Sequence, residues 1–179
     1  MEGKKVALIE VEGEATARNV VEVALVNQLL RHGSFQLVTK EAVQAARLAP
    51  EQKPDDWQGI ARRAGADYAL RARVLEFDGD TRTGIKKVVV EDSQMAAERG
   101  EKERMTERLV KAKSLTAKVR VQLEFANLAK KDPRIAVAEH EETVEADEEH
   151  EAIHLPPKLR FLEKVANDAF GNFFEKYAD

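Results

Sequence analysis

Residues 115–128 read LTAKVRVQLEFANL, and apolar and polar side chains alternate strictly from Leu115 to Phe125. A period of two held over eleven residues predicts a half-buried β-strand. The following KKDP, residues 130–133, supplies a turn, and residues 134–146 show a second strand pattern. The two segments together predict a long antiparallel hairpin.

The part of the chain before this hairpin predicts alternating strands and helices. Lys5–Val11 is an almost continuous apolar run, typical of a strand covered on both faces. Apolar residues recur at helical spacing over Glu14–His32, and Gly33 stands where a helix C-cap is expected. Phe35–Thr39 predicts a second strand, and Thr39 is a suitable N-cap for a helix over Lys40–Ala49.

Further elements lie between these and the hairpin, and after it. Asp55–Ala64 predicts a short helix, and Ala66–Phe77 predicts a strand with Arg71 and Arg73 on its polar face. Gly79 and Gly84 indicate a turn before a short strand over Ile85–Val90. Pro156-Pro157 opens a last helix with one apolar face. We therefore predict an α/β (α+β) fold: a three-layer-like mixed sheet flanked by helices, with a long antiparallel hairpin and a charged insertion.

Composition excludes several functional classes. The chain has 179 residues, 35% of them charged, a net charge of −4 and 6% aromatic residues, which argues against a generally basic nucleic-acid binder. With no cysteine, it has no disulfide framework, no thiolate zinc site and no cysteine nucleophile. The sequence contains no run of about 18 apolar residues, the length that would predict a membrane span.

The length fits one domain over residues 1–179. Residues 83–113 form a charged insertion in this prediction. Its part from Glu91 to Lys113 carries six acids and six bases, which is typical of a solvated helix or a loop. Residues 147–157 are an acidic connector, and residues 158–178 form the C-terminal helix.

Three stretches resemble a bacterial envelope family: Lys5–Glu10 (KVALIE), Leu25–Val43 (LVNQLLRHGSFQLVTKEAV) and Ile60–Val74 (IARRAGADYALRARV). The family includes the curli-secretion (CsgG-type) lipoproteins, the lipoprotein activators of penicillin-binding proteins and the N-terminal domain of TolB. The resemblance rests on packing and turn residues, and no catalytic signature is involved. It implies the soluble, periplasmic-type version of the fold, and places the family's lipid-bearing cysteine in a leader that this chain lacks.

His150-Glu151-Ala152-Ile153-His154 matches the H-E-x-x-H pattern. On a helix, His150 and His154 could hold zinc, with Glu151 as the general base and His140 or a carboxylate as third ligand. Pro156 and Pro157 follow at once and the preceding turn has no apolar anchor, so we interpret the segment as an acidic connector. We predict no catalytic, cofactor-binding or metal site and no cofactor, and keep His150, Glu151 and His154 as metal candidates.

Two charged surfaces have a structural and a functional interpretation. The run Glu139–Glu151 holds eight carboxylates and no Lys or Arg. It fits either a docking or calcium-binding patch or, as we favour, the solvated end of an edge strand. Arg71 and Arg73, with Lys118 and Arg120, could form a lightly compensated basic stripe that binds anions. A solvent-facing sheet surface is our default for it.

Four aromatic residues also have two interpretations. Trp57 is expected to anchor a short helix to the core, with an exposed interface as the alternative. Phe170, Phe173 and Phe174 are expected in the core. Phe170 and Phe174 fall partly off the main apolar stripe, so a dimer or partner contact remains open for them.

The functional prediction is a non-enzymatic protein-interaction domain of a bacterial envelope lipoprotein-like protein. It would bind a protein partner at an unknown surface, would not bind nucleic acid, and would reach a membrane only through a missing N-terminal lipid anchor. A homo-oligomer is compatible with this prediction. The location is the periplasm or the periplasmic face of the outer membrane if a leader was removed, and otherwise the cytoplasm. The alternatives are a metal-dependent hydrolase using the H-E-x-x-H segment and a cytoplasmic adaptor with the same fold.

Overall fold

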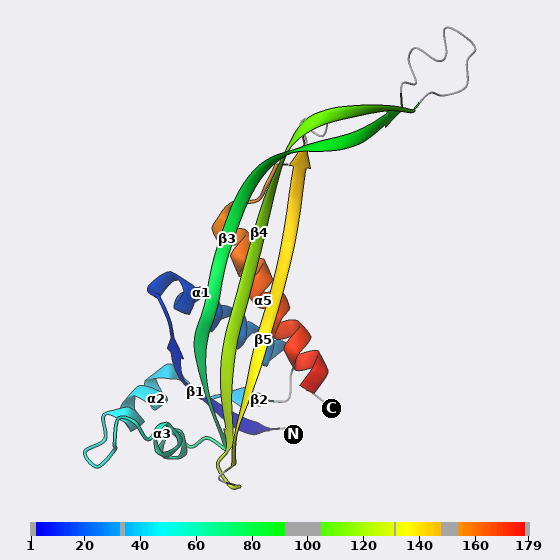
Figure 1. Ribbon diagram of the computed structural model, residues 1–179. Helices are drawn as coiled ribbons and strands as arrows, with labels where there is room; N and C mark the ends of the chain where they lie inside the picture. The colour runs from blue at the N-terminus through cyan, green and yellow to red at the C-terminus, as the bar shows by residue number, and fades with distance from the viewer. Residues whose placement is uncertain (1–2, 33–34, 92–104, 131, 148–153, 178–179) are drawn as a thin grey trace.

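The computed structural model describes residues 3–32, 35–91, 105–130, 132–147 and 154–177 (Figure 1). Within them, five strands form one mixed sheet in the order β2-β1-β3-β4-β5. The first three strands in this order run parallel, and β3, β4 and β5 are successively antiparallel. The elements along the chain are β1 (Lys4–Glu12), α1 (Ala15–Arg31), β2 (Phe35–Leu37), α2 (Lys40–Arg47), α3 (Trp57–Arg63), β3 (Tyr68–Glu91), β4 (Met105–Asn127), β5 (Asp132–Asp147) and α5 (Lys158–Tyr177).

The helix starts follow from local chemistry. Each of the first three helices begins after a residue whose side-chain oxygen accepts backbone N–H groups of the first turn: Glu14 for α1, Thr39 for α2 and Asp56 for α3. Such caps satisfy amide groups that have no partner inside the helix. Gly65 follows α3 with φ of +77°, a conformation that favours glycine. The predicted C-cap Gly33 lies outside the described residues.

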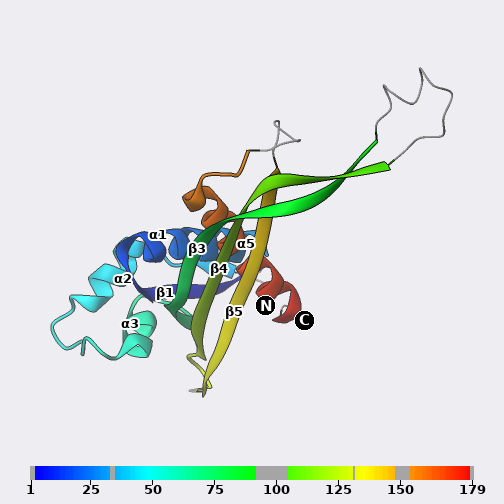
Figure 2. The ribbon, with the colours of Figure 1, turned by 45° about the horizontal axis from the view of Figure 1, so that its top comes forward.

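Helices cover the sheet on both faces, which gives two hydrophobic clusters (Figure 2). In the larger cluster, α1 and α5 pack on one face against β1, β3 and β4, with Val6, Val119 and Phe170 fully buried. In the smaller cluster, α2 and α3 pack on the other face against Ala7 and Ala69. The predicted α/β fold with a mixed sheet flanked by helices is confirmed.

The predicted hairpin is β4 paired with β5, with Leu115 opposite Val144 and Phe125 opposite Arg134. Within residues 115–123, the alternation of apolar and polar residues corresponds to an alternation of buried and more exposed side chains. On the face of β4 that α5 covers, Phe125 is half-buried, and five apolar residues are buried: Leu115, Ala117, Val119, Val121 and Leu123. The structure therefore confirms the strand that the alternation predicted.

Strands β3 and β4 are much longer than predicted. The turn expected between Gly79 and Gly84 is wrong, because β3 continues to Glu91 and pairs with β4 throughout. The helix or loop expected from the mixed charges is wrong for residues 105–113, which belong to β4. The rest of that stretch, residues 92–104, lies outside the described residues.

The long strands extend past the rest of the sheet. Strand β5 ends at Asp147, opposite Ala112 of β4, and β4 pairs there with Gly84 of β3. Beyond this level, β3 and β4 are the only strands that pair among the described residues, and they project away from the helices (Figure 1). We call residues 85–91 and 105–111 the arm.

Helix α5 buries the middle of the face that its spacing predicted, and Phe173, expected in the core, is only half-buried. Leu162, Ala166 and Ala169 are buried, whereas Leu159 is 45% exposed. Phe170 is completely buried, so the core interpretation is correct for it. Phe174 is half-buried and its ring lies 5.6 Å from that of His32.

Candidate functional site

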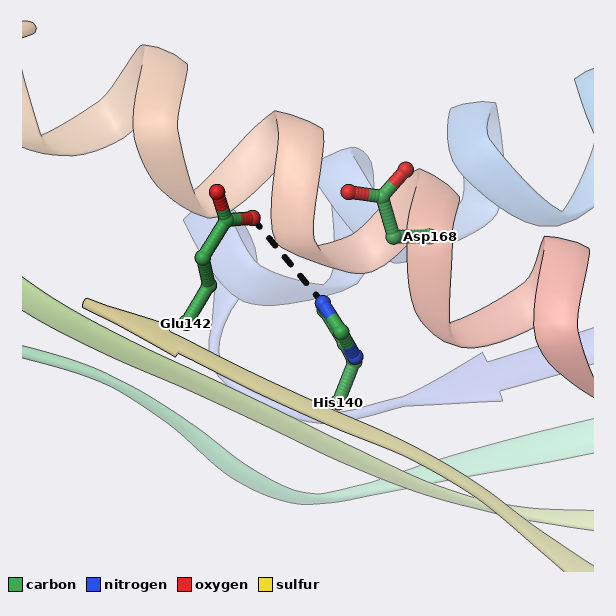
Figure 3. Close-up of side chains that lie close together, drawn as sticks. All are labelled: His140, Glu142 and Asp168. Carbon is green, nitrogen blue, oxygen red and sulfur yellow. Dashed lines mark ion pairs between the residues drawn. The ribbon is translucent and has the colours of Figure 1, made fainter. Parts of the chain in front are cut away.

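Among the described residues, His140, Glu142 and Asp168 form a group whose ligand-type atoms all lie within 4.8 Å of one another. His140 and Glu142 are two residues apart on β5, so their side chains share a face and point toward α5, which carries Asp168 (Figure 3). His140 Nε2 lies 3.9 Å from Glu142 Oε2. An imidazole and two carboxylates are suitable ligands for a divalent metal.

Lys164 already pairs with both carboxylates of this group. Its ammonium donates to Glu142 and, at 2.9 Å, to Asp168 Oδ2. The hydrogen bond to Glu142, and then that to Asp168, raise the pKa of Lys164 above its usual value. A metal ion would have to displace this ammonium. The geometry therefore describes an ionic link between the edge strand and α5.

The acidic run of β5 is tied to the rest of the sheet as well. Strand β5 is the last strand of the sheet, so the predicted edge position is confirmed. Glu139 pairs with Arg120 at 3.3 Å, and Glu145 pairs with Lys86 at 2.7 Å. This second pair raises the pKa of Lys86, chiefly through the hydrogen bond to Glu145. Much of the carboxylate charge of β5 is thus matched by cations from β3, β4 and α5.

Of the three predicted metal candidates, His150 and Glu151 lie outside the described residues. His154 is exposed in the irregular segment before α5. His140, named as a possible third ligand for that zinc site, lies beside Glu142 and Asp168. The three residues thus stay candidates, and the absence of a metal site stays a prediction.

The predicted basic stripe is wrong as a lightly compensated surface, because each of its four cations pairs with a carboxylate. The pairs are Arg71–Glu124 at 2.6 Å, Arg73–Glu12 at 2.6 Å, Lys118–Glu76 at 3.1 Å and Arg120–Glu139 at 3.3 Å. Three of the acids come from strands whose register the sequence did not show. The hydrogen bond that Arg73 donates to Glu12 raises the pKa of Arg73. The default interpretation, a solvent-facing sheet surface, is therefore more fully compensated than the sequence predicted.

Trp57 anchors α3 as predicted. Its half-buried side chain packs against the smaller cluster, and the guanidinium carbon of Arg71 lies 5.0 Å from the ring centroid. This cation–π contact joins α3 to the polar face of β3.

The arm carries an apolar surface that the sequence prediction missed. Ile85 is 75% exposed, Leu109 70% and Val89 56%. Lys87 is opposite Leu109 and Lys111 is opposite Ile85, so the three apolar side chains lie on one face. Val110, which points to the other face, is 8% exposed. The sequence predicted a short strand over Ile85–Val90, but it did not show the pairing of Ile85–Val89 with residues 107–111.

The described fold and surfaces define a class: an α/β domain with a mixed sheet and a projecting two-stranded arm. None of its described helices combines the length and apolar character needed to cross a membrane.

No known family model matches the chain, and no curated protein matches it. It is similar to the solved PelC dodecamer from Paraburkholderia phytofirmans, at 11% identity and a TM-score of 0.41, over 95% of this chain and 84% of that chain. It is similar to the LpoB C-terminal domain from Salmonella enterica, at 15% identity and a TM-score of 0.44, over 78% and 84%. A third similar structure is lipoprotein GNA1162 from Neisseria meningitidis, at 7% identity and a TM-score of 0.42, over 96% and 99%.

By their names, two of these neighbours are the C-terminal domain of LpoB and a lipoprotein. The likeness concerns the course of the chain, and no residue role is taken from it. Membership of the predicted family remains a prediction.

Proposed function

We propose that the chain is a non-enzymatic protein-interaction domain of a bacterial envelope lipoprotein-like protein, and that the arm contacts its partner. The observation that carries this proposal is the exposure of Ile85, Val89 and Leu109 on one face of the arm, where they alternate with Lys87, Glu107 and Lys111. Apolar side chains grouped on one face of a projecting element are typical of interaction sites.

Unpaired strand edges support the same surface. On its β1 side, β3 has no strand partner among the described residues after Arg73, which is opposite Glu12. On its β5 side, β4 likewise has none before Ala112, which is opposite Asp147. Both outer edges of the arm thus offer backbone groups to an added strand. Apolar side chains and free edges together suit a protein partner.

Site-specific photo-crosslinking in cells of the source organism tests the proposal. A benzophenone amino acid replaces Ile85 or Leu109 in the full chain, and Leu48 serves as a matched control, since it is 73% exposed at the end of α2. We expect discrete protein adducts from positions 85 and 109 and none from position 48. An adduct of twice the mass of the chain identifies a second copy as the partner. Equal labelling at all three positions, or no adduct at the arm, overturns the proposal.

Metal analysis distinguishes the alternative, a metal-dependent hydrolase, from the proposed interaction domain. Tight, stoichiometric zinc in the intact chain, lost on combining His150→Ala with His154→Ala, would contradict a non-enzymatic interaction domain. We expect neither chain to retain zinc through dialysis against a weak chelator.

The envelope location rests on the resemblance of three sequence stretches, and the cytoplasmic adaptor is its alternative. The coding sequence upstream of Met1 distinguishes them. A leader sequence that ends in a lipobox cysteine supports an envelope lipoprotein. A coding sequence without such a leader overturns that location.

A further inference from the structure

A cleft of about 240 Å³ lies where the parallel part of the sheet is incomplete. Strand β2 has only three residues, and Leu37, its last, is opposite Val6. The following part of β1, Leu8–Val11, has no strand on that side among the described residues. Helices α1 and α2 complete the walls of the cleft.

The lining of this cleft holds more cationic than acidic side chains. Three cations line it, Arg18, Lys40 and Arg47, together with the acids Glu10 and Glu22. Lys40 forms an ion pair with Glu22, so these two charges compensate each other. The two guanidinium groups remain, with Glu10 as the other acid of the lining. Neither Arg18 nor Arg47 forms an ion pair within the described part of the chain.

Arg47 is held in place without a counter-ion. Its Nη2 donates to the backbone oxygen of Ile9 at 2.9 Å, at the point where the register of β1 with β3 shifts. Its Nε is buried and has no hydrogen-bond partner among the described residues. A partly buried guanidinium is costly unless an anion accompanies it. The backbone anchor at a β-bulge therefore positions a positive charge that lacks its partner.

The rest of the lining is largely apolar. Leu8, Val26, Leu37 and Val43 contribute side chains from β1, α1, β2 and α2. An apolar wall with a few fixed polar groups is the usual composition of a small-molecule site. The volume is below the usual range for drug-sized ligands, which points to a small occupant.

We propose that this cleft binds a small organic anion, a carboxylate with a short apolar chain. The carboxylate pairs with the guanidinium groups of Arg47 and Arg18, and the chain contacts the apolar wall. A planar guanidinium suits a carboxylate because it donates two parallel hydrogen bonds. This site is separate from the arm, so either proposal can fail without the other.

Titration with hexanoate tests the site, with hexanamide as an uncharged probe of the same shape. Backbone amide NMR shifts of the full chain should saturate with hexanoate and concentrate in Leu8–Val11 and Lys40–Arg47. Hexanamide should leave these amides unchanged at the same concentration. Shifts spread over exposed lysines and arginines, or equal shifts with both probes, overturn the proposal.

Single substitutions test which arginine binds the carboxylate of hexanoate. We expect Arg47→Gln to weaken hexanoate binding by about tenfold or more, as for loss of a charge-assisted hydrogen-bond pair. Arg18→Gln should weaken it while leaving the bond between Arg47 and Ile9 intact, which keeps the test valid if Arg47→Gln unfolds. Arg62→Gln, at an exposed arginine of α3 outside the cleft, is the matched control and should bind as the wild type does. Unchanged affinity in Arg18→Gln and in a folded Arg47→Gln overturns the proposal.

Discussion

At the scale of single residues, Glu14 shows how a side chain fixes a helix start. Its carboxylate accepts hydrogen bonds from the amides of Thr16 at 3.0 Å and Ala17 at 3.3 Å. The bond from Thr16, and then that from Ala17, hold the pKa of Glu14 below its ordinary value of 4.5. Because the ionised form is the better acceptor, folding favours the charged carboxylate.

The pH dependence of stability follows from this shift. A lowered pKa in the folded state means that Glu14 stabilises the fold above pH 4.5, and that this contribution is lost as the pH falls below 4.5. We expect Glu14→Gln to lower the free energy of unfolding near pH 7 and to differ less from the wild type in acid. Urea unfolding at several pH values measures the difference. For the control Glu51→Gln, in an exposed loop, the difference in free energy of unfolding from the wild type should not shrink in acid. A difference for Glu14→Gln that stays constant with pH would contradict the role given to Glu14.

Phe170 provides a test of the core at the same scale. Its side chain is completely buried in the larger cluster, between α5 and the sheet. We expect Phe170→Ala to lower the free energy of unfolding by about 3–5 kcal/mol, since it leaves a cavity. Phe174→Ala should cost roughly 1–2 kcal/mol, because this ring is only half-buried. Chemical denaturation compares the two, and equal losses would argue against this packing.

At the scale of elements, the ionic link between β5 and α5 depends on both partners. Lys164 is about half exposed, so its pairing with Glu142 should contribute only about 0.2–1 kcal/mol in a double-mutant cycle of Lys164→Met and Glu142→Gln. The raised pKa of Lys164 means that this contribution is present at neutral pH and is lost as the pH rises through that pKa.

Removal of the ammonium also changes what the site can bind. In Lys164→Met, His140, Glu142 and Asp168 keep their places without an internal cation. We expect this variant to bind zinc more tightly than the wild type, measured by competition with a chromophoric chelator. Lys176→Met, at the other end of α5, is the control. Equal zinc affinity in the wild type and Lys164→Met would show that the lysine does not block the group.

Elements also show what the sequence could and could not predict. Period-two alternation and helix caps are local, so α1, α2 and the C-terminal end of β4 were predicted close to their observed bounds, whereas β4 begins ahead of the predicted Leu115, at Met105. Gly79 was interpreted as part of a turn, but it lies inside β3, where the Lys158 side chain occupies the space of a Cβ. The pairing of Arg71 with Glu124, and the meeting of Glu142 with Asp168, depend on strand register and helix docking, which no local pattern specifies.

At the scale of the whole molecule, burial falls sharply from the body to the arm. In the body, β3 lies between β1 and β4. Helices α1 and α5 cover one face of the sheet there, and α2 and α3 cover part of the other. In the arm, β3 and β4 pair without a further strand among the described residues, and three of the apolar side chains face solvent. Two-stranded ribbons are marginal alone, so backbone hydrogen bonds should open more readily here than in the body.

Hydrogen exchange of the isolated chain should follow this gradient. We expect strong amide protection in Ala69–Arg73 and Val119–Leu123, where the strands have neighbours on both sides, and weak protection in Ile85–Val89 and Arg108–Lys111. A bound partner should slow exchange in the arm and leave the body unchanged, because no third strand in the described part of the chain pairs with the arm. Uniform protection along β3 in the isolated monomer would contradict this account. It would mean that contacts beyond the β3–β4 pairing already stabilise the arm, and its apolar face would then need no partner.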